Sequence, residues 1–276
     1  MTATFNHDRL SFRYRDEGTG LPFVFQHGLG ADGSQPFALF RPPTGVRLLC
    51  LDCRAHGQTK PLGDESSLSL ATFADDLAAL LAHLGIDRAV VGGISMGAAV
   101  ALNLAFRHPE RVLGLVLSRP AWVDAPRPAN VEVFARIAAL IRAHPPAEAR
   151  ERFAATEDYR RIQRESSDAA ASLLRQFDDP RIEETVARLE RIPSDTPFHG
   201  LPPWASVQAP ALVMANRQDP IHPFDYGLTL ARLLPNAAFR EITPKAVSLR
   251  AHTEDVQQAI AGFLSAHFPV PSPAYA

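Results

Sequence analysis

The stretch VVGGISMGAAVALNLAF, residues 90–106, is apolar at nearly every position, yet it contains several glycines and one serine. A single buried element would be weakened by these glycines, and its serine would need a hydrogen-bond partner. Two elements joined by a very sharp turn account for the composition better. We therefore expect a buried strand over residues 88–93, a turn at Ser95 and a helix over residues 96–110.

The rest of the chain alternates in the same way between short strands and helices. Apolar runs and period-two alternation predict strands over residues 10–17, 23–26, 47–52, 112–118, 209–216 and 237–242. Apolar residues at helical spacing predict helices over residues 70–85, 227–235 and 253–268. Strands and helices in this order imply right-handed crossovers. The sequence thus predicts an α/β fold, with a mostly parallel sheet flanked by helices.

The pattern changes between residues 122 and 207. This stretch has arginine-rich helical patterns at 131–144 and 181–192, many prolines and no convincing strand. We interpret residues 122–207 as an inserted all-helical lid, or cap, over the carboxyl edge of the sheet, where open α/β sheets bind ligands. Residues 1–121 and 208–276 would form the core. The tail PVPSPAYA (residues 269–276) is expected to be disordered.

Composition and charge exclude several classes of function. The chain has 276 residues, with 28 Lys and Arg against 30 Asp and Glu, so it carries no basic footprint for nucleic acid or for a membrane surface. Its start, MTATFNHDRL, lacks the apolar core of a secretory signal, and residues 90–106 are too short to span a membrane. We expect a cytoplasmic protein that acts on a small molecule. Monomer and homodimer both remain open.

The two cysteines, Cys50 and Cys53, have the spacing C-x-x-C in the stretch CLDC. No second cysteine pair or histidine cluster lies close by, so we expect reduced, partly buried thiols and no zinc site. No metal-ligand cluster or phosphate loop stands out elsewhere. The prediction is a protein without metal or cofactor.

The turn at Ser95 has the pattern G-x-S-x-G, in the stretch Gly93–Gly97. This pattern is typical of a nucleophile elbow, in which a strained turn between strand and helix presents the serine hydroxyl above the sheet. Side chains two residues before or after the serine would collide with neighbouring backbone, so both positions favour glycine. The following helix directs free N–H groups and its positive dipole end toward the same place.

At this point the chain resembles the α/β-hydrolase superfamily over nearly all of its length outside the helical insertion. Residues 27–30 (HGLG) resemble the His-Gly loop of that family. Residues 52–59 (DCRAHGQT) resemble its D-x-R-G-x-G-x-S stretch, with Ala55 in place of a glycine and Thr59 in place of a serine. Residues 216–220 (NRQDP) resemble the loop that carries the catalytic acid.

The resemblance implies a triad in the order serine, acid, histidine. A serine needs a base, and the base needs an orienting carboxylate. We expect Ser95 to be the nucleophile and Asp219 the acid, with Asp124 as an alternative acid because some relatives supply it from that region. His252 is the expected base, placed between the last strand and the last helix, although the family usually has Gly-His where this chain has LRAHTEDV.

Two other histidines follow Asp219: His222 lies in the loop of the acid itself, and His267 lies at the end of the last helix. The backbone N–H groups of Leu29 and Met96 are expected to form the oxyanion hole. Four apolar residues are candidates either for ordinary core packing or for the substrate pocket: Trp122, Phe134, Ile137 and Trp204.

The leading hypothesis is a cofactor-free serine hydrolase that forms an acyl-enzyme from a small or medium carboxylic ester, thioester or lactone. Carbon–carbon bond hydrolysis and perhydrolysis use the same triad and stay open. Haloalkane dehalogenation and epoxide hydrolysis are disfavoured, because those branches have an aspartate where this chain has Ser95. A non-catalytic small-molecule receptor and a cofactor-free oxygenase on the same fold are the alternatives from other classes.

Overall fold

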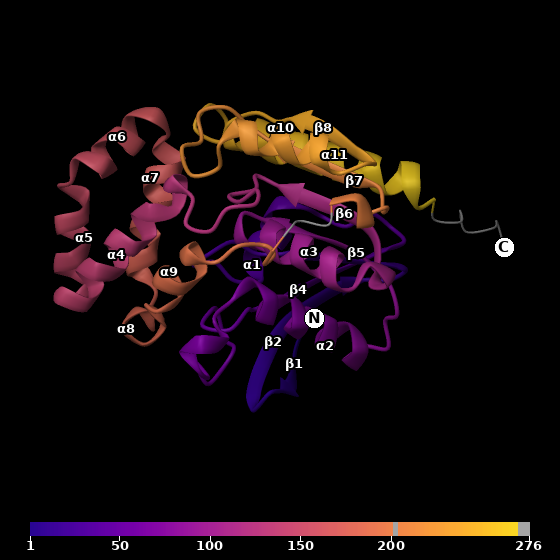
Figure 1. The fold of residues 1–276 in the computed structure, drawn as a ribbon, viewed down its shortest axis with the longest axis horizontal. Coiled ribbons are helices and arrows are strands. Elements are labelled where there is room, and N and C mark those ends of the chain that lie inside the picture. Colours follow the sequence, from indigo (N-terminus) through magenta and orange to yellow (C-terminus); the bar gives the residue numbers. More distant parts are fainter. Residues whose placement is uncertain (201–203, 270–276) are drawn as a thin grey trace.

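An eight-stranded sheet forms the centre of the computed structural model, which describes residues 1–200 and 204–269 (Figure 1). Its strands are β1 (Thr2–His7), β2 (Leu10–Gly18), β3 (Leu21–Gln26), β4 (Val46–Leu51), β5 (Ala89–Ile94), β6 (Val112–Ser118), β7 (Ala211–Ala215) and β8 (Ala237–Glu241). Their spatial order is β1-β2-β4-β3-β5-β6-β7-β8. β2 pairs antiparallel with β1 and β4, and the other neighbours pair parallel. The predicted α/β fold is confirmed.

The central strands are buried on both faces, which explains their continuous apolar sequences. Because side chains alternate along a strand, Val24 of β3 joins one buried cluster whereas Phe23 and Phe25 join a second cluster on the opposite face. In β5, Val91 and Val90 divide between the two clusters in the same way. Both faces of the sheet therefore need helices to cover them.

Five helices of the core supply this cover: α1 (Ser34–Leu39), α2 (Leu70–His83), α3 (Met96–Arg107), α10 (Phe224–Leu233) and α11 (Leu249–His267). Leu77 of α2, Val100 of α3 and Leu230 of α10 belong to the first cluster. Leu39 of α1 and Ile260 of α11 belong to the second. In the part of the chain that the structure describes, no helix is long and apolar enough to cross a membrane.

The structure departs from the predicted elements at several places; α1, for example, was not predicted. β1 was not predicted, because Phe5 is its one fully buried side chain and the alternation is faint. α11 begins at Leu249 rather than at residue 253, because the Ser248 side chain accepts a hydrogen bond from the Ala251 N–H and caps the helix. The helix predicted over residues 181–192 is divided into α8 and α9.

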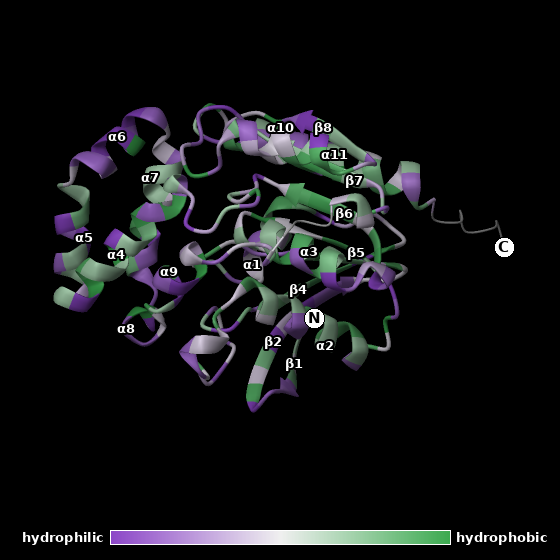
Figure 2. Ribbon diagram, in the orientation of Figure 1, coloured by the Kyte–Doolittle hydropathy of each residue, from purple (hydrophilic) through white to green (hydrophobic). Residues whose placement is uncertain are grey.

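Between β6 and β7 the chain forms a helical segment, and within its described residues no strand occurs. The helices of this segment are α4 (Glu132–Ala143), α5 (Pro146–Ala154), α6 (Glu157–Glu165), α7 (Ser167–Leu174), α8 (Ile182–Thr185) and α9 (Arg188–Arg191). They gather at one end of the molecule beside the sheet (Figure 1), and α6 is largely hydrophilic (Figure 2). Asn103 of α3 donates a hydrogen bond of 2.6 Å to the Pro197 carbonyl, where the segment returns to the core. The predicted tail lies, apart from its first residue, outside the described residues.

Cys50 lies in β4 and Cys53 lies just after it, and both are buried, free thiols. Gln26 at the end of β3 donates a hydrogen bond of 3.1 Å to the Cys53 sulfur. Burial raises the pKa of both thiols far above their ordinary value. The thiols are thus fully protonated in the folded protein.

Candidate active site

Ser95 occupies the turn between β5 and α3, with φ 57° and ψ −112°. This positive φ is rare for a residue with a side chain, and such strain concentrates at functional sites. A Cβ on Gly93 would collide with the backbone of Gly97, and a Cβ on Gly97 would collide with the carbonyl of Gln26. The predicted sharp turn and its requirement for both glycines are confirmed.

The loop after β3 lies against this turn, because β3 and β5 are neighbours and Gln26 pairs with Gly93. Its conformation is held by Gln35, whose side-chain oxygen accepts a hydrogen bond of 2.8 Å from the Gly28 N–H. No hydrogen-bond acceptor for the Leu29 and Met96 N–H groups occurs in residues 1–200 and 204–269.

A cavity of about 60 Å³, which we call the inner cavity, lies at the carboxyl ends of the parallel strands. Its lining comes from the core and the helical segment alike: Gly28, Leu29, Gln35, Ile94, Ser95, Arg119, Phe134, Asp168, Ala169, Ser172, Leu173, Arg175, Asp219, Ile221, His222 and Lys245. From β3 the chain continues to β4, the neighbour on one side, and then crosses to β5, the neighbour on the other side. The strand order therefore reverses at β3, beside this cavity. Open α/β sheets bind ligands at that point.

Asp219 and His222 form a hydrogen-bonded pair in the loop after β7. The His222 Nδ1–H donates to both Asp219 oxygens, at 2.9 and 3.0 Å, and the N–H groups of Ile221 and His222 also donate to the carboxylate. Burial alone would raise the pKa of Asp219, but His222 and then Arg119 hold it well below its ordinary value. Burial lowers the pKa of His222, and Asp219 offsets part of this effect. The pair is therefore a carboxylate and a neutral imidazole whose Nε2 can accept a proton.

His252 was expected between the last strand and the last helix. In the structure it lies in the first turn of α11. It is fully buried, and its Nδ1–H donates a hydrogen bond of 2.7 Å to the Thr243 carbonyl instead of to Asp219. Its Nε2 is buried without a partner in the described chain. Burial, and next the charge of Arg119, lower the pKa of His252 to about 4. In the structure Asp219 is therefore paired with His222, and the expected hydrogen bond between Asp219 and His252 is not formed.

The remaining candidates separate into one that lines the inner cavity and several that do not. Phe134 of α4 lines it. Trp122 and Ile137 are buried, and neither side chain is part of the lining. Trp204 packs edge-on against Phe106, at 5.3 Å between ring centres. Asp124, the alternative acid, is solvent-exposed and lies outside the lining.

Sequence reasoning missed three cationic residues of the inner cavity. Arg119 follows β6 directly, and its Nη1 donates a hydrogen bond of 3.2 Å to Asp219. Lys245 lies in the loop between β8 and α11, and burial, together with Arg119, lowers its pKa to about 8. Arg175 follows α7. An arginine immediately after a buried strand was a signal for Arg119, but no local pattern indicated the other two.

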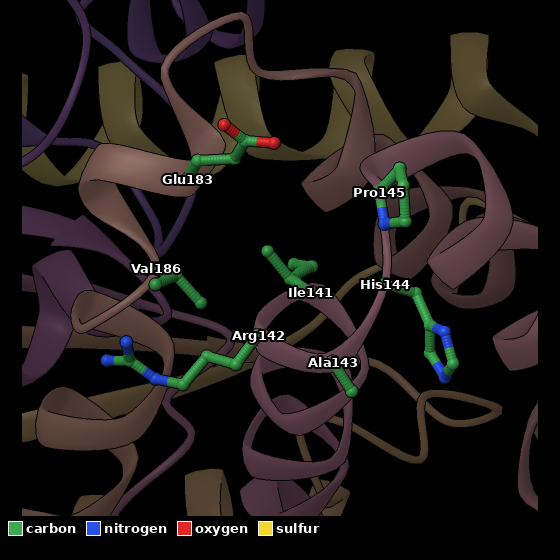
Figure 3. A pocket seen from close by; sticks show the side chains of 7 residues that line it. All are labelled: Ile141, Arg142, Ala143, His144, Pro145, Glu183 and Val186. Atoms are coloured by element: carbon green, nitrogen blue, oxygen red, sulfur yellow. The ribbon is translucent and has the colours of Figure 1, made fainter.

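Two further hollows lie nearby. An outer cavity of about 570 Å³ shares Leu29, Gln35, Ser172, Arg175 and Lys245 with the inner cavity. A hollow of about 670 Å³ between α4 and α8 has Ile141 and Val186 at its floor, whereas His144 points away from it (Figure 3). That hollow includes none of the residues of the turn at Ser95. Among the described residues, no group of three or more His, Cys, Asp and Glu side chains could hold a metal ion.

Comparison with known proteins agrees with this architecture. The family model for the α/β hydrolase fold matches residues 22–246. The 2-hydroxymuconate semialdehyde hydrolase of Pseudomonas putida is 29% identical over 231 residues, which cover 80% of this chain and 79% of the relative. A thermophilic esterase from Thermogutta terrifontis superposes with a TM-score of 0.73 at 26% identity, covering 97% of this chain and 99% of the esterase.

A second solved structure, the enol-lactonase from Burkholderia xenovorans, has a TM-score of 0.71 at 22% identity. The superposition covers 95% of this chain and 100% of the lactonase chain. At that identity the likeness concerns the fold. The match of the family model is far longer than half of the chain, and the relative from Pseudomonas putida bears the name of a hydrolase. The chain therefore belongs to the α/β hydrolase fold family.

Proposed function

We propose that the protein is a serine hydrolase that forms an acyl-enzyme at Ser95 from a small or medium carboxylic ester, thioester or lactone. One observation carries the proposal: Ser95, at positive φ, lines the same inner cavity as the Asp219–His222 pair. The Leu29 and Met96 N–H groups, which are without acceptors in the described chain, serve as the oxyanion hole. These are the parts that acyl transfer requires: a nucleophile, an oriented base and donors for the oxyanion.

His222, and not His252, is the proposed base. As Ser95 Oγ bonds to the substrate carbonyl carbon, its proton passes to His222 Nε2 and the carbonyl oxygen becomes an oxyanion. The intermediate then collapses, and the leaving oxygen or sulfur takes the proton from His222. Water repeats the cycle on the acyl group at Ser95 and releases the acid. Asp219 holds the Nδ1–H tautomer throughout, which keeps Nε2 free to accept.

Residues 122–207 are proposed to act as the lid of this site, on a core of residues 1–121 and 208–276. Phe134 of α4 and Leu173 of α7 come from the helical segment, and both line the inner cavity. Gln176, just after α7, donates a hydrogen bond of 3.4 Å to the Leu29 carbonyl. The segment thus touches the loop that supplies one oxyanion donor, so it can set the shape of the acyl site.

Carbon–carbon bond hydrolysis is the second candidate, because the relative from Pseudomonas putida bears the name of such an enzyme and the same residues would serve. Perhydrolysis needs the same residues and peroxide. A non-catalytic binding protein is the contrasting possibility. The fold is shared by all three, so activity has to decide.

The test is turnover of p-nitrophenyl esters, from acetate to decanoate, by the wild type and by Ser95→Ala at about pH 8. Loss of the nucleophile should lower kcat/KM by about three orders of magnitude or more. Ser66→Ala is the matched control, because Ser66 is exposed and lies outside the lining of the inner cavity. A fluorophosphonate should label the wild type and not Ser95→Ala. Labelling without turnover of any ester would overturn the hydrolase proposal in favour of the binding protein.

A further inference from the structure

The inner cavity is lined by three cations that come from three separate parts of the chain. Arg119 follows β6, Lys245 lies between β8 and α11, and Arg175 belongs to the helical segment. Two carboxylates face them, those of Asp168 and Asp219. With His222 neutral, the groups that line the cavity carry one net positive charge. Acyl transfer at Ser95 does not need this charge, so it calls for another explanation.

None of the three cations is fully paired. Arg119 donates one hydrogen bond to Asp219, and its buried Nε is without a partner in the described chain. The Lys245 Nζ is 4.0 Å from the nearest Asp168 oxygen, which is beyond hydrogen-bond length. Arg175 makes no ion pair with any residue in the described ranges.

Two arginines elsewhere in the chain show close pairing with a carboxylate. Arg54 binds both oxygens of Asp76, at 2.8 and 2.7 Å. Arg142 binds both oxygens of Glu190, at 2.7 Å each. The cations of the inner cavity lack such close partners, and the buried Arg119 guanidinium, with its unused Nε donor, has bonding capacity for an anion.

We propose that Lys245 and Arg175, supported by Arg119, bind a carboxylate of the substrate, so that the preferred substrate is an ester or lactone that also carries a free carboxylate. This inference rests on the proposed function and specifies its substrate class. A carboxylate is the appropriate anion, because it accepts hydrogen bonds from both an ammonium and a guanidinium.

The shape of the two cavities places this group. Lys245 and Arg175 line both the inner and the outer cavity, so they stand at the junction between them. The inner cavity, about 60 Å³, has room for a short chain only, since one water in the liquid takes about 30 Å³. A reacting carbonyl at Ser95 would therefore have its carboxylate a few bonds away, at the junction. Burial among positive charges lowers the pKa of Lys245, and an incoming carboxylate would relieve that repulsion.

The experiment compares two pairs of stable esters, each pair differing in one carboxylate. Monomethyl glutarate and methyl pentanoate place the charge on the acyl side. 4-Acetoxybenzoate and phenyl acetate place it on the leaving group. We expect kcat/KM to be about tenfold to a hundredfold higher for the acid in at least one pair. The pair that shows the preference identifies the side on which the carboxylate is bound.

The variants are Lys245→Met and Lys245→Arg, with Arg161→Gln as the control. Lys245→Met should reduce the acid-to-neutral ratio of kcat/KM by about tenfold, and Lys245→Arg should keep most of that ratio. Arg161 is an exposed arginine that pairs with Glu165 on the same helix, so its replacement should leave the ratio unchanged.

Glutarate binding to Ser95→Ala, measured by calorimetry, separates the two proposals. If the esters are hydrolysed with equal kcat/KM in both pairs, the carboxylate site is overturned while the hydrolase stands. If no ester is hydrolysed but glutarate binds to Ser95→Ala and not to Ser95→Ala/Lys245→Met, the carboxylate site stands and the hydrolase is overturned. If glutarate binds with the same affinity to Ser95→Ala and to Ser95→Ala/Lys245→Met, the carboxylate site would also be overturned.

Discussion

Asparagine in place of His222 should abolish turnover, whereas asparagine in place of His252 should not. The two replacements are matched, because the asparagine amide can donate from nearly the position of Nδ1 but has no counterpart of Nε2. His222→Asn can thus keep a hydrogen bond to Asp219, and His252→Asn can keep the one to the Thr243 carbonyl. Each variant thus removes the proton-accepting nitrogen, together with part of the ring, and keeps the hydrogen bond made by the other side of the imidazole.

The expected magnitude follows from the role of that nitrogen. If His222 Nε2 takes the proton from Ser95, its removal should lower kcat/KM by about three to four orders of magnitude. This corresponds to roughly 4–5.5 kcal/mol of transition-state stabilisation. His252 is fully buried, with its Nε2 unpartnered in the described chain, so the smaller asparagine should cost about 1–3 kcal/mol of stability through lost packing. Its effect on kcat/KM should be below about tenfold.

The assay is steady-state hydrolysis of the best p-nitrophenyl ester, with urea denaturation of each variant to confirm folding. The converse result would refute the reasoning: His252→Asn inactive and well folded, with His222→Asn active. The base would then be the histidine of α11, reached by a rearrangement of Arg119 and Asp219. Equal, small effects of both replacements would remove histidine from the mechanism altogether.

Three other predictions test the charge and packing of the protein. Since protonated Lys245 binds the carboxylate, kcat/KM for monomethyl glutarate should fall as pH rises through about 8, while methyl pentanoate keeps its rate; pH profiles of both esters check this. Gly262→Ala should raise the free energy of unfolding by about 0.5–1 kcal/mol, because the added Cβ enters open space in α11. Gly97→Ala should lower the free energy of unfolding by about 1–3 kcal/mol or more, because its Cβ collides with backbone. Urea denaturation of the two variants measures both effects. Arg54→Met should cost about 3–5 kcal/mol by leaving the Asp76 carboxylate buried and unpaired, and Asp76→Leu in addition should restore most of the stability in the same assay.

Much of the fold could be predicted because its signals are local. Strands buried on both faces have continuous apolar sequences, as in residues 21–26 and 112–118, and the glycines around Ser95 report a collision within one turn. β1 escaped notice because an edge strand with one buried side chain has little alternation. Local patterns thus predict elements well where burial constrains every residue.

The site was predicted less completely, because it depends on how separate loops meet. The cap at Ser248 was readable in the sequence and would have placed His252 inside α11. His222 lies only three residues after Asp219 and was not predicted to be the base. The tight turn between them is what brings the imidazole within hydrogen-bond distance of the carboxylate. Lys245 and Arg175 are 70 residues apart, and no pattern in one sequence shows that their loops converge.

The buried thiols of Cys50 and Cys53 have a practical consequence. They are the two cysteines of the sequence, and both lie against the centre of the sheet with strongly raised pKa values. A disulfide reagent in solution therefore finds no reactive sulfur until the sheet itself opens. The rate at which such a reagent consumes thiols reports the free energy of that opening, without any added probe. The two natural cysteines therefore report unfolding by their labelling rate. A single cysteine introduced at the surface would be labelled much faster than either of them.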